Sequence, residues 1–76
     1  ALALAAAGQA ADAVGLLQAL LKNTPNDADA HNALGLAQAS LGRQDDAVHH
    51  FERAVSLKPE LAEAWSNLAV CLAEQG

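Results

Sequence analysis

A pattern of residues that recurs every 34 positions constrains the fold of this chain more than any other feature. Pro25 recurs as Pro59, and Gly8 recurs as Gly42. The further matches at this spacing are Gly42 with Gly76, Ala13 with Ala47, Val14 with Val48, Leu17 with Phe51, Ala28 with Ala62, Ala30 with Ala64, His31 with Trp65, and Leu34 with Leu68. A fixed period of this length predicts a stack of similar supersecondary units, in which each unit buries its apolar face against a neighbour.

The composition favours helices in these units. Hydrophobic residues make up 53% of the 76 residues, much of this fraction is alanine, and aromatic residues make up only 3%. Alanine has the highest helix propensity, and strong β-formers are sparse. The sequence therefore predicts an all-α chain with close helix–helix packing.

Charge and hydropathy exclude several kinds of partner. The net charge is −5, and the four lysines and arginines are scattered. Nucleic acids and anionic membrane surfaces both require clustered cations, so neither is expected as a partner. No uninterrupted apolar run reaches the length of a membrane span, so no membrane insertion is expected. The single cysteine, Cys71, cannot form an internal disulfide, which fits a reducing compartment and a cytoplasmic location.

The positions of glycine and proline in the chain predict about five helices. Gly8 and Gly42 are expected at turns, because glycine ends a helix by taking a positive φ. Pro25 and Pro59 are expected at the other turns, since proline cannot continue a helix. Asp27 is a predicted N-cap. The expected helices are residues 1–7, residues 9–23, residues 28–41, a helix opened by Asp45 and Asp46 and ended by Lys58-Pro59, and residues 60–75.

Apolar residues at spacings of three and four predict the packing faces. Phe51 is expected to fill the space between repeats, and Gly35 to lie where the partner helix comes closest. The other residues expected on packing faces are Val14, Leu17, Leu20, Leu21, His31, Leu34, Gln38, Ala47, Ala54, Val55, Trp65, Leu68, Ala69 and Leu72.

The order of these residues resembles the tetratricopeptide repeat (TPR) family over the whole chain in one register. The middle repeat carries the resemblance through His31, Leu34-Gly35, Gln38, Gly42, Ala47, Phe51, Ala54 and Pro59. It implies a right-handed superhelical solenoid of antiparallel helix pairs, with a partial repeat at 1–27, a complete repeat at 28–61 and the first helix of a further repeat at 62–76. The chain then reads as a fragment of a longer array. His31 and Gln38 replace large hydrophobes of the family pattern, which should loosen their helix, and Leu20 replaces a small alanine and should fill space.

The residues that could carry chemistry have simpler structural explanations. His49 and His50 point about 100° apart on a helix, so they cannot easily share an ion, and no metal site or cofactor is expected. Cys71 is interpreted as a small buried hydrophobe. Asp45 and Asp46 suit the first turn of a helix. No catalytic residue is predicted in these residues.

The resemblance implies a binding surface, because in this family the first helix of each repeat lines a concave groove that holds peptides or short helices. The residues at these positions are Asp29, Asn32, Leu36, Ala39 and Ser40 in the middle repeat and Glu63, Ser66, Asn67, Val70, Ala73 and Glu74 in the third. These faces carry carboxylates and no cation, so a neutral or basic peptide is expected and an acidic tail is not. The predicted function is a protein–protein interaction scaffold.

Two other functions remain open from the sequence. The segment from Ala64 to Ala69 resembles repeats of O-linked N-acetylglucosamine transferases, in which an asparagine at the position of Asn67 helps grip a substrate backbone. Ala33 stands at the matching position of the middle repeat, so such a ladder would be interrupted. A substrate-recruiting segment of a larger enzyme is therefore one alternative. Self-assembly through apolar ends of the solenoid is the other.

Overall fold

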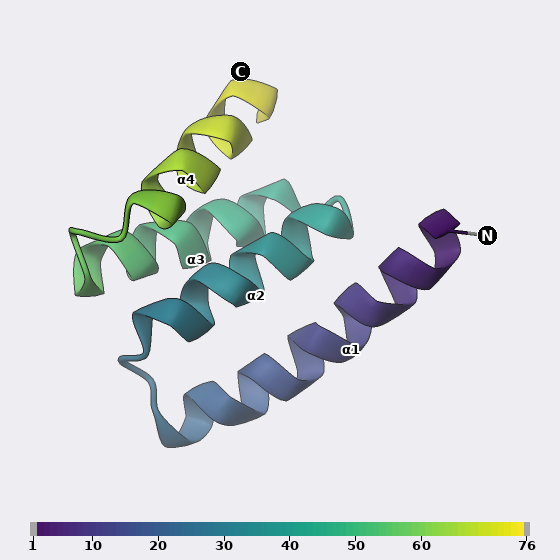
Figure 1. Ribbon diagram of the computed structural model, residues 1–76, viewed down its shortest axis with the longest axis horizontal. Helices are drawn as coiled ribbons and strands as arrows, with labels where there is room; N and C mark the ends of the chain where they lie inside the picture. The colour runs from purple at the N-terminus through teal and green to yellow at the C-terminus, as the bar shows by residue number, and fades with distance from the viewer. Residues whose placement is uncertain (1, 76) are drawn as a thin grey trace.

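The computed structural model describes the backbone of residues 2–75 and the side chains of residues 9–74. Within this range the chain forms four α-helices (Figure 1). They are α1 (Leu2–Asn23), α2 (Ala28–Ser40), α3 (Gln44–Leu57) and α4 (Ala62–Gln75). The prediction of an all-α repeat fold is confirmed.

Successive helices lie side by side and run in alternating directions (Figure 1). α2 packs against α1 and α3, α3 packs against α4, and α2 also meets α4. α1 and α4 lie at opposite edges of the array. The chain measures 37 × 33 × 17 Å, so it forms a thin layer with long faces on both sides.

The predicted turn at Gly8 is wrong. α1 runs without a break through Gly8, so the structure has four helices where the sequence predicted about five. A glycine inside a helix costs only about 0.5–1 kcal/mol relative to alanine, and the alanines around Gly8 have high helix propensity. No proline stands nearby to enforce a break. Gly76, the third glycine of the series, lies outside the described residues.

The turn at Gly42 forms as predicted. Gly42 has a φ of 80°, and its N–H donates to Ala39 O over 3.0 Å. Arg43 N–H donates to Gln38 O over 2.9 Å. These two bonds are those of the Schellman motif, which satisfies the last carbonyls of a helix and turns the chain sharply. α2 ends at Ser40, one residue before the predicted end, and α3 begins at Gln44, one residue before Asp45.

The two proline turns have the same hydrogen bond but different helix starts. Asp27 N–H donates to Thr24 O over 3.2 Å, and Leu61 N–H donates to Lys58 O over 3.0 Å. The Asp27 side chain then accepts from Ala30 N–H over 3.1 Å, which confirms the predicted N-cap. Leu61 has no side-chain acceptor to offer. Residues 60 and 61 lie in the turn, so the prediction that the last helix begins at residue 60 is wrong by two residues.

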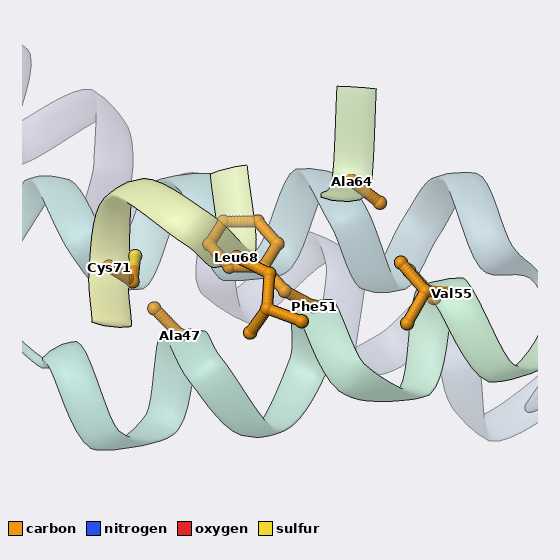
Figure 2. Close-up of a cluster of buried hydrophobic side chains, with 7 residues drawn as sticks. Ala47, Phe51, Val55, Ala64, Leu68 and Cys71 are labelled. Carbon is orange, nitrogen blue, oxygen red and sulfur yellow. The ribbon is translucent and has the colours of Figure 1, made fainter. Parts of the chain in front are cut away.

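Two clusters of buried side chains hold the helices together. One joins α1 to α2 through Ala10, Val14, Leu34 and Ala37. The other joins α3 to α4 and is built from Ala47, Phe51, Ala54, Val55, Ala64, Leu68 and Cys71 (Figure 2). Phe51 is fully buried in this second cluster. A Cβ atom added at Gly35 would lie 2.6 Å from Phe51 Cε1, which explains why α2 has a glycine there.

Four residues expected on packing faces, Leu20, Trp65, Ala69 and Leu72, are more exposed than predicted. Leu20 is 43% exposed, so it does not fill space inside the array. Trp65 and Leu72 on α4 are about half exposed. α4 packs against α3 through Ala64, Leu68 and Cys71, and this narrow stripe leaves the flanking residues outside the core.

Candidate functional site

A groove of about 260 Å³ lies where α2 and α4 meet above the start of α3. Phe51 and Cys71 are buried residues among its walls, and Leu36 and Val70 are exposed apolar residues on its two sides. Ala39 completes the apolar part. The polar residues that line it are Ser40, Gln44, Asn67 and Glu74. The groove thus combines an apolar base with polar groups from three helices.

The structure brings together most of the residues predicted for the binding face. Leu36, Ser40, Asn67, Val70 and Glu74 line the groove, as does Ala39. Asp29, Glu63, Ser66 and Ala73 are exposed but do not line it. Asn32 is only 6% exposed, so it lies beneath the face on which it was predicted.

Asn32 and Asn67 form a polar link between α2 and α4. Asn67 Nδ2 donates to Asn32 Oδ1 over 3.0 Å. Asn32 is buried, so it requires such a partner. The bond holds the Asn67 amide at the edge of the groove and leaves its oxygen as an acceptor for other donors. The sequence singled out Asn67 as a residue that could grip a peptide backbone, but it did not reveal this partner.

Three residues that line the groove were not predicted for the binding face: Phe51 and Cys71, which were assigned to the core, and Gln44, which was assigned to a turn. Gln44 Nε2 donates to Glu74 Oε2 over 3.0 Å and so links the start of α3 to the last turn of α4. Gln44 and Glu74 are 30 residues apart in the sequence. Nothing in the local pattern predicts that contact.

Cys71 shows no sign of reactivity. It is buried in the α3–α4 cluster, as expected for a small hydrophobe. Burial raises the pKa of the thiol, and the Glu74 carboxylate raises it further. The thiol therefore stays protonated near neutral pH, and the protonated form is a poor nucleophile.

The histidines form a structural contact near the other end of α2. The stacked rings of His31 and His50 have their centroids 5.3 Å apart, and their Nδ1 atoms are 3.1 Å apart. His31 Nε2 lies 2.9 Å from Pro25 O. In the next repeat, Trp65 Nε1 donates to Pro59 O over 2.8 Å. The His31 ring therefore makes the same contact with a proline carbonyl as the ring of the equivalent tryptophan. The replacement of an aromatic residue by His31 does not by itself require a looser helix.

No group of three or more His, Cys, Asp or Glu side chains among the described residues is placed to hold a metal ion. Within residues 2–75, none of the four helices combines the length and the hydropathy that a membrane span requires.

Comparison with known proteins identifies the family. The profile of the tetratricopeptide repeat family matches residues 1–61 and again residues 41–76. The chain therefore belongs to the tetratricopeptide repeat family.

Two similar proteins are peroxisomal targeting signal receptors. The receptor of Candida glabrata is 43% identical over 53 residues, and that of Saccharomyces cerevisiae is 38% identical over 53 residues. The matched segment is 70% of this chain but only 9% of each receptor. The family and these relatives support a role in protein–protein interaction.

Proposed function

We propose that the groove between α2 and α4 binds an extended peptide segment of a partner protein. The observation that carries this proposal is the convergence of Leu36, Val70 and Asn67 on one cavity from two helices. The two apolar residues are 40% and 54% exposed and can cover apolar side chains of a peptide. The Asn67 amide oxygen can accept a hydrogen bond from a peptide N–H without reading the side chain.

The charge of the face favours a neutral or basic peptide over an acidic one. Glu74 lines the groove, and Asp29 and Glu63 are exposed on the same two helices. Neither lysine nor arginine is among the described residues that line the groove. A carboxylate-rich segment would meet like charge, which lowers both the rate and the strength of association.

The relatives add a class of ligand to this proposal. They are named as receptors for a peroxisomal targeting signal, so the bound segment would be a signal carried by another protein. The residues described here act in this proposal as a binding module and not as an enzyme. A substrate-recruiting segment of a glycosyltransferase is less favoured, because Ala33 stands at the position of the middle repeat that matches Asn67 and interrupts the ladder.

A pull-down from cell lysate tests the groove. Leu36→Arg, Val70→Arg places two cations in the groove at exposed positions, so the fold should survive and the partner should be lost. The matched control is Leu16→Arg, Leu20→Arg, which makes the same kind of change at exposed leucines of α1. Circular dichroism checks that both variants are folded. A partner that persists with the groove variant, or is lost equally with both, contradicts the proposal.

Self-association is the second function with a specific observation behind it. Half-exposed Trp65 and Leu72 on α4 and exposed Leu16 on α1 lie on helices at opposite edges of the array. A contact between two such edges is heterologous and can propagate. Sedimentation at increasing concentration measures it: a constant monomer mass rules it out, and a rising mass that Leu16→Arg abolishes supports it.

A further inference from the structure

The repeat makes the two edges of the array equivalent to the two halves of its central interface. α2 and α3 make the most extensive contact between helices in the structure. Residues 62–74 of α4 correspond to α2 after a shift of 34 residues. Residues 10–23 of α1 correspond in the same way to α3. α4 is thus a second α2, and this part of α1 is a second α3.

One side of α4 is covered and the other is not. The stripe of α4 that packs on α3 is buried, like the stripe of α2 that packs on α1. α2 has a further buried stripe, in which His31 meets His50 of α3 and Gly35 lies against Phe51. In this stripe Ala28, His31, Gly35 and Gln38 are buried, whereas the corresponding residues Ala62, Trp65, Ala69 and Leu72 are exposed. α4 therefore exposes the face with which α2 receives α3.

α1 exposes the matching face at the opposite edge. His50 and Ala54 of α3 correspond to Leu16 and Leu20 of α1. Ala54 is fully buried and His50 is half-buried, whereas Leu16 is 73% exposed and Leu20 is 43% exposed. α1 and α4 lie at opposite edges of the array (Figure 1), so the two exposed faces cannot cover each other within one chain.

The counterparts of the His31–His50 contact are both apolar. Trp65 corresponds to His31, and Leu16 corresponds to His50. Trp65 Nε1 donates to Pro59 O over 2.8 Å, and His31 makes the same contact with the equivalent proline carbonyl. The indole therefore has the same anchor as the imidazole, and its one polar group is already paired. Covering this ring and Leu16 would remove apolar surface from water without leaving a polar atom unpaired.

The counterparts of the Gly35–Phe51 contact fit with their sizes exchanged. Ala69 corresponds to Gly35, and Leu17 corresponds to Phe51. A Cβ atom at Gly35 would lie 2.6 Å from the Phe51 ring. Leucine has no ring, so it can face an alanine where phenylalanine requires a glycine. Leu17 also packs on the α1–α2 cluster, as Phe51 does in the α3–α4 cluster.

The face of α4 also lacks an unpaired polar atom that its counterpart on α2 contains. Gln38 is buried, and its Oε1 has no hydrogen-bond partner among the described residues. The corresponding residue of α4 is Leu72, which requires no partner when it is covered. A contact between the two edges would thus be more apolar than the α2–α3 interface that it copies.

We infer that copies of this chain associate head to tail, with α1 of one copy packed on α4 of the next as α3 packs on α2. Trp65 of one copy meets Leu16 of the other, and Ala69 meets Leu17. Every pair leaves one face of each kind uncovered, so the contact repeats and forms a linear array. This inference rests on the self-association proposed above, to which it adds the faces, the register and the residue pairs.

Sedimentation of two single variants and of their mixture tests the direction of the contact. Leu16→Arg leaves the α4 face intact, and Trp65→Arg leaves the α1 face intact. Each variant alone should associate roughly thirtyfold more weakly than the unmodified chain, or less, as expected when a central apolar anchor is lost. Their equimolar mixture should form a dimer and nothing larger, because only one intact pair of faces remains.

One control variant and a second α4 variant support this test. Gln18→Arg adds the same charge at an exposed position of α1, and its counterpart Glu52 is exposed on α3. It should leave self-association unchanged. Circular dichroism checks that each variant is folded. If Trp65→Arg loses helical signal, Ala69→Arg replaces it at another exposed position of the same stripe.

The outcomes separate the register from self-association itself. A monomer mass that stays constant with concentration in the unmodified chain overturns both. If either variant alone associates as strongly as the unmodified chain, two like faces are in contact, which overturns the head-to-tail register and leaves self-association intact. A mixture without dimer overturns the register as well. So does an equal loss in Gln18→Arg, because added charge anywhere on α1 would then explain the effect.

Discussion

Gly8 and Gly42 occupy equivalent places in the repeat, yet they have opposite roles in the structure. Gly42 ends α2 with a φ of 80° and reverses the chain. Gly8 lies inside α1, which continues through it. The helices near them also pack differently. Phe51 of α3 is fully buried against Gly35 of α2, whereas Leu17, the equivalent of Phe51 on α1, is only partly buried.

This difference shows that glycine permits a turn without causing one. A sharp turn removes helical hydrogen bonds, and the packing of the two helices that it joins must compensate. α2 and α3 provide such packing through a fully buried phenylalanine and small residues on both sides. At Gly8 the helix continues, because a helical glycine is only slightly unfavourable and the neighbouring alanines favour the helix.

Phe51→Ala should cause the largest loss of stability in the molecule. Phe51 is fully buried, so the free energy of unfolding should fall by about 3–5 kcal/mol. Leu17→Ala, at the equivalent place on α1, should cost roughly half of that because Leu17 is only partly buried. Thermal and urea unfolding followed by circular dichroism measure both. Equal losses would mean that the two regions are packed alike.

If Phe51→Ala leaves too little structure to measure, Gly35→Ala tests the same contact. Its Cβ atom would approach Phe51 Cε1 to 2.6 Å, so the variant should be destabilised. The same substitution in the Phe51→Leu background should cost less, because the branched side chain has no ring edge at that point. If Gly35→Ala lowers the free energy of unfolding equally in both backgrounds, the clash with the Phe51 ring is not its cause.

Alanine substitution at the two glycines should have opposite signs. Gly42→Ala should destabilise the chain by about 1–2 kcal/mol, because alanine is strained at positive φ. Nothing lies within 4 Å of a Cβ atom at Gly42, so the effect would come from the backbone alone. Gly8→Ala should increase stability by about 0.5–1 kcal/mol through helix propensity. A loss of helical signal in Gly8→Ala would show that a turn forms there in solution.

Gln38→Leu should stabilise the chain by about 1 kcal/mol. Gln38 is only 4% exposed, and its Oε1 has no hydrogen-bond partner among the described residues. Removing such an acceptor recovers the cost of burying it unpaired. Leu72 already occupies the equivalent place in the third repeat. Gln18→Leu, at an exposed position of α1, is the control and should change stability by less than about 0.5 kcal/mol.

The smallest expected effect is a loss of stability in mild acid through His50. Pro25 O is an acceptor, so His31 Nε2 must donate to it, His31 Nδ1 then accepts, and His50 Nδ1 carries the proton between the rings. Burial lowers the pKa of His50 below its ordinary value of 6.5, charge on His31 and His49 lowers it further, Asp46 opposes this and Arg53 adds to it.

The sign follows from this lowered pKa. The unfolded chain binds a proton at His50 more readily than the folded chain does. The stabilisation is therefore complete above pH 6.5 and is lost as the pH falls from there through the lower pKa of the folded state. Melting temperatures one unit above and one unit below that pH should differ. The difference should shrink in His50→Gln and persist in His49→Gln, whose ring is exposed. A difference that is unchanged in His50→Gln contradicts this account.

Much of the fold followed from the sequence. The 34-residue period and the alanine-rich composition predicted the all-α repeat architecture, which the family match and the four helices confirm. Asp27 and Gly42 were predictable because an N-cap and a positive-φ glycine act through their own neighbours in the chain. Gly35 was predicted to lie where the partner helix comes closest, and the structure shows that Phe51 of that helix lies against it. The assignment of the groove residues to peptide binding stays a proposal.

The tertiary structure decided what depends on atoms far apart in the chain. Gln44 meets Glu74, Asn67 meets Asn32, and His31 meets His50 only after the helices have packed, so local patterns could not reveal these contacts. Local sequence determines which backbone conformations a residue can adopt, and the helices that pack around it determine which of those conformations has the lowest free energy.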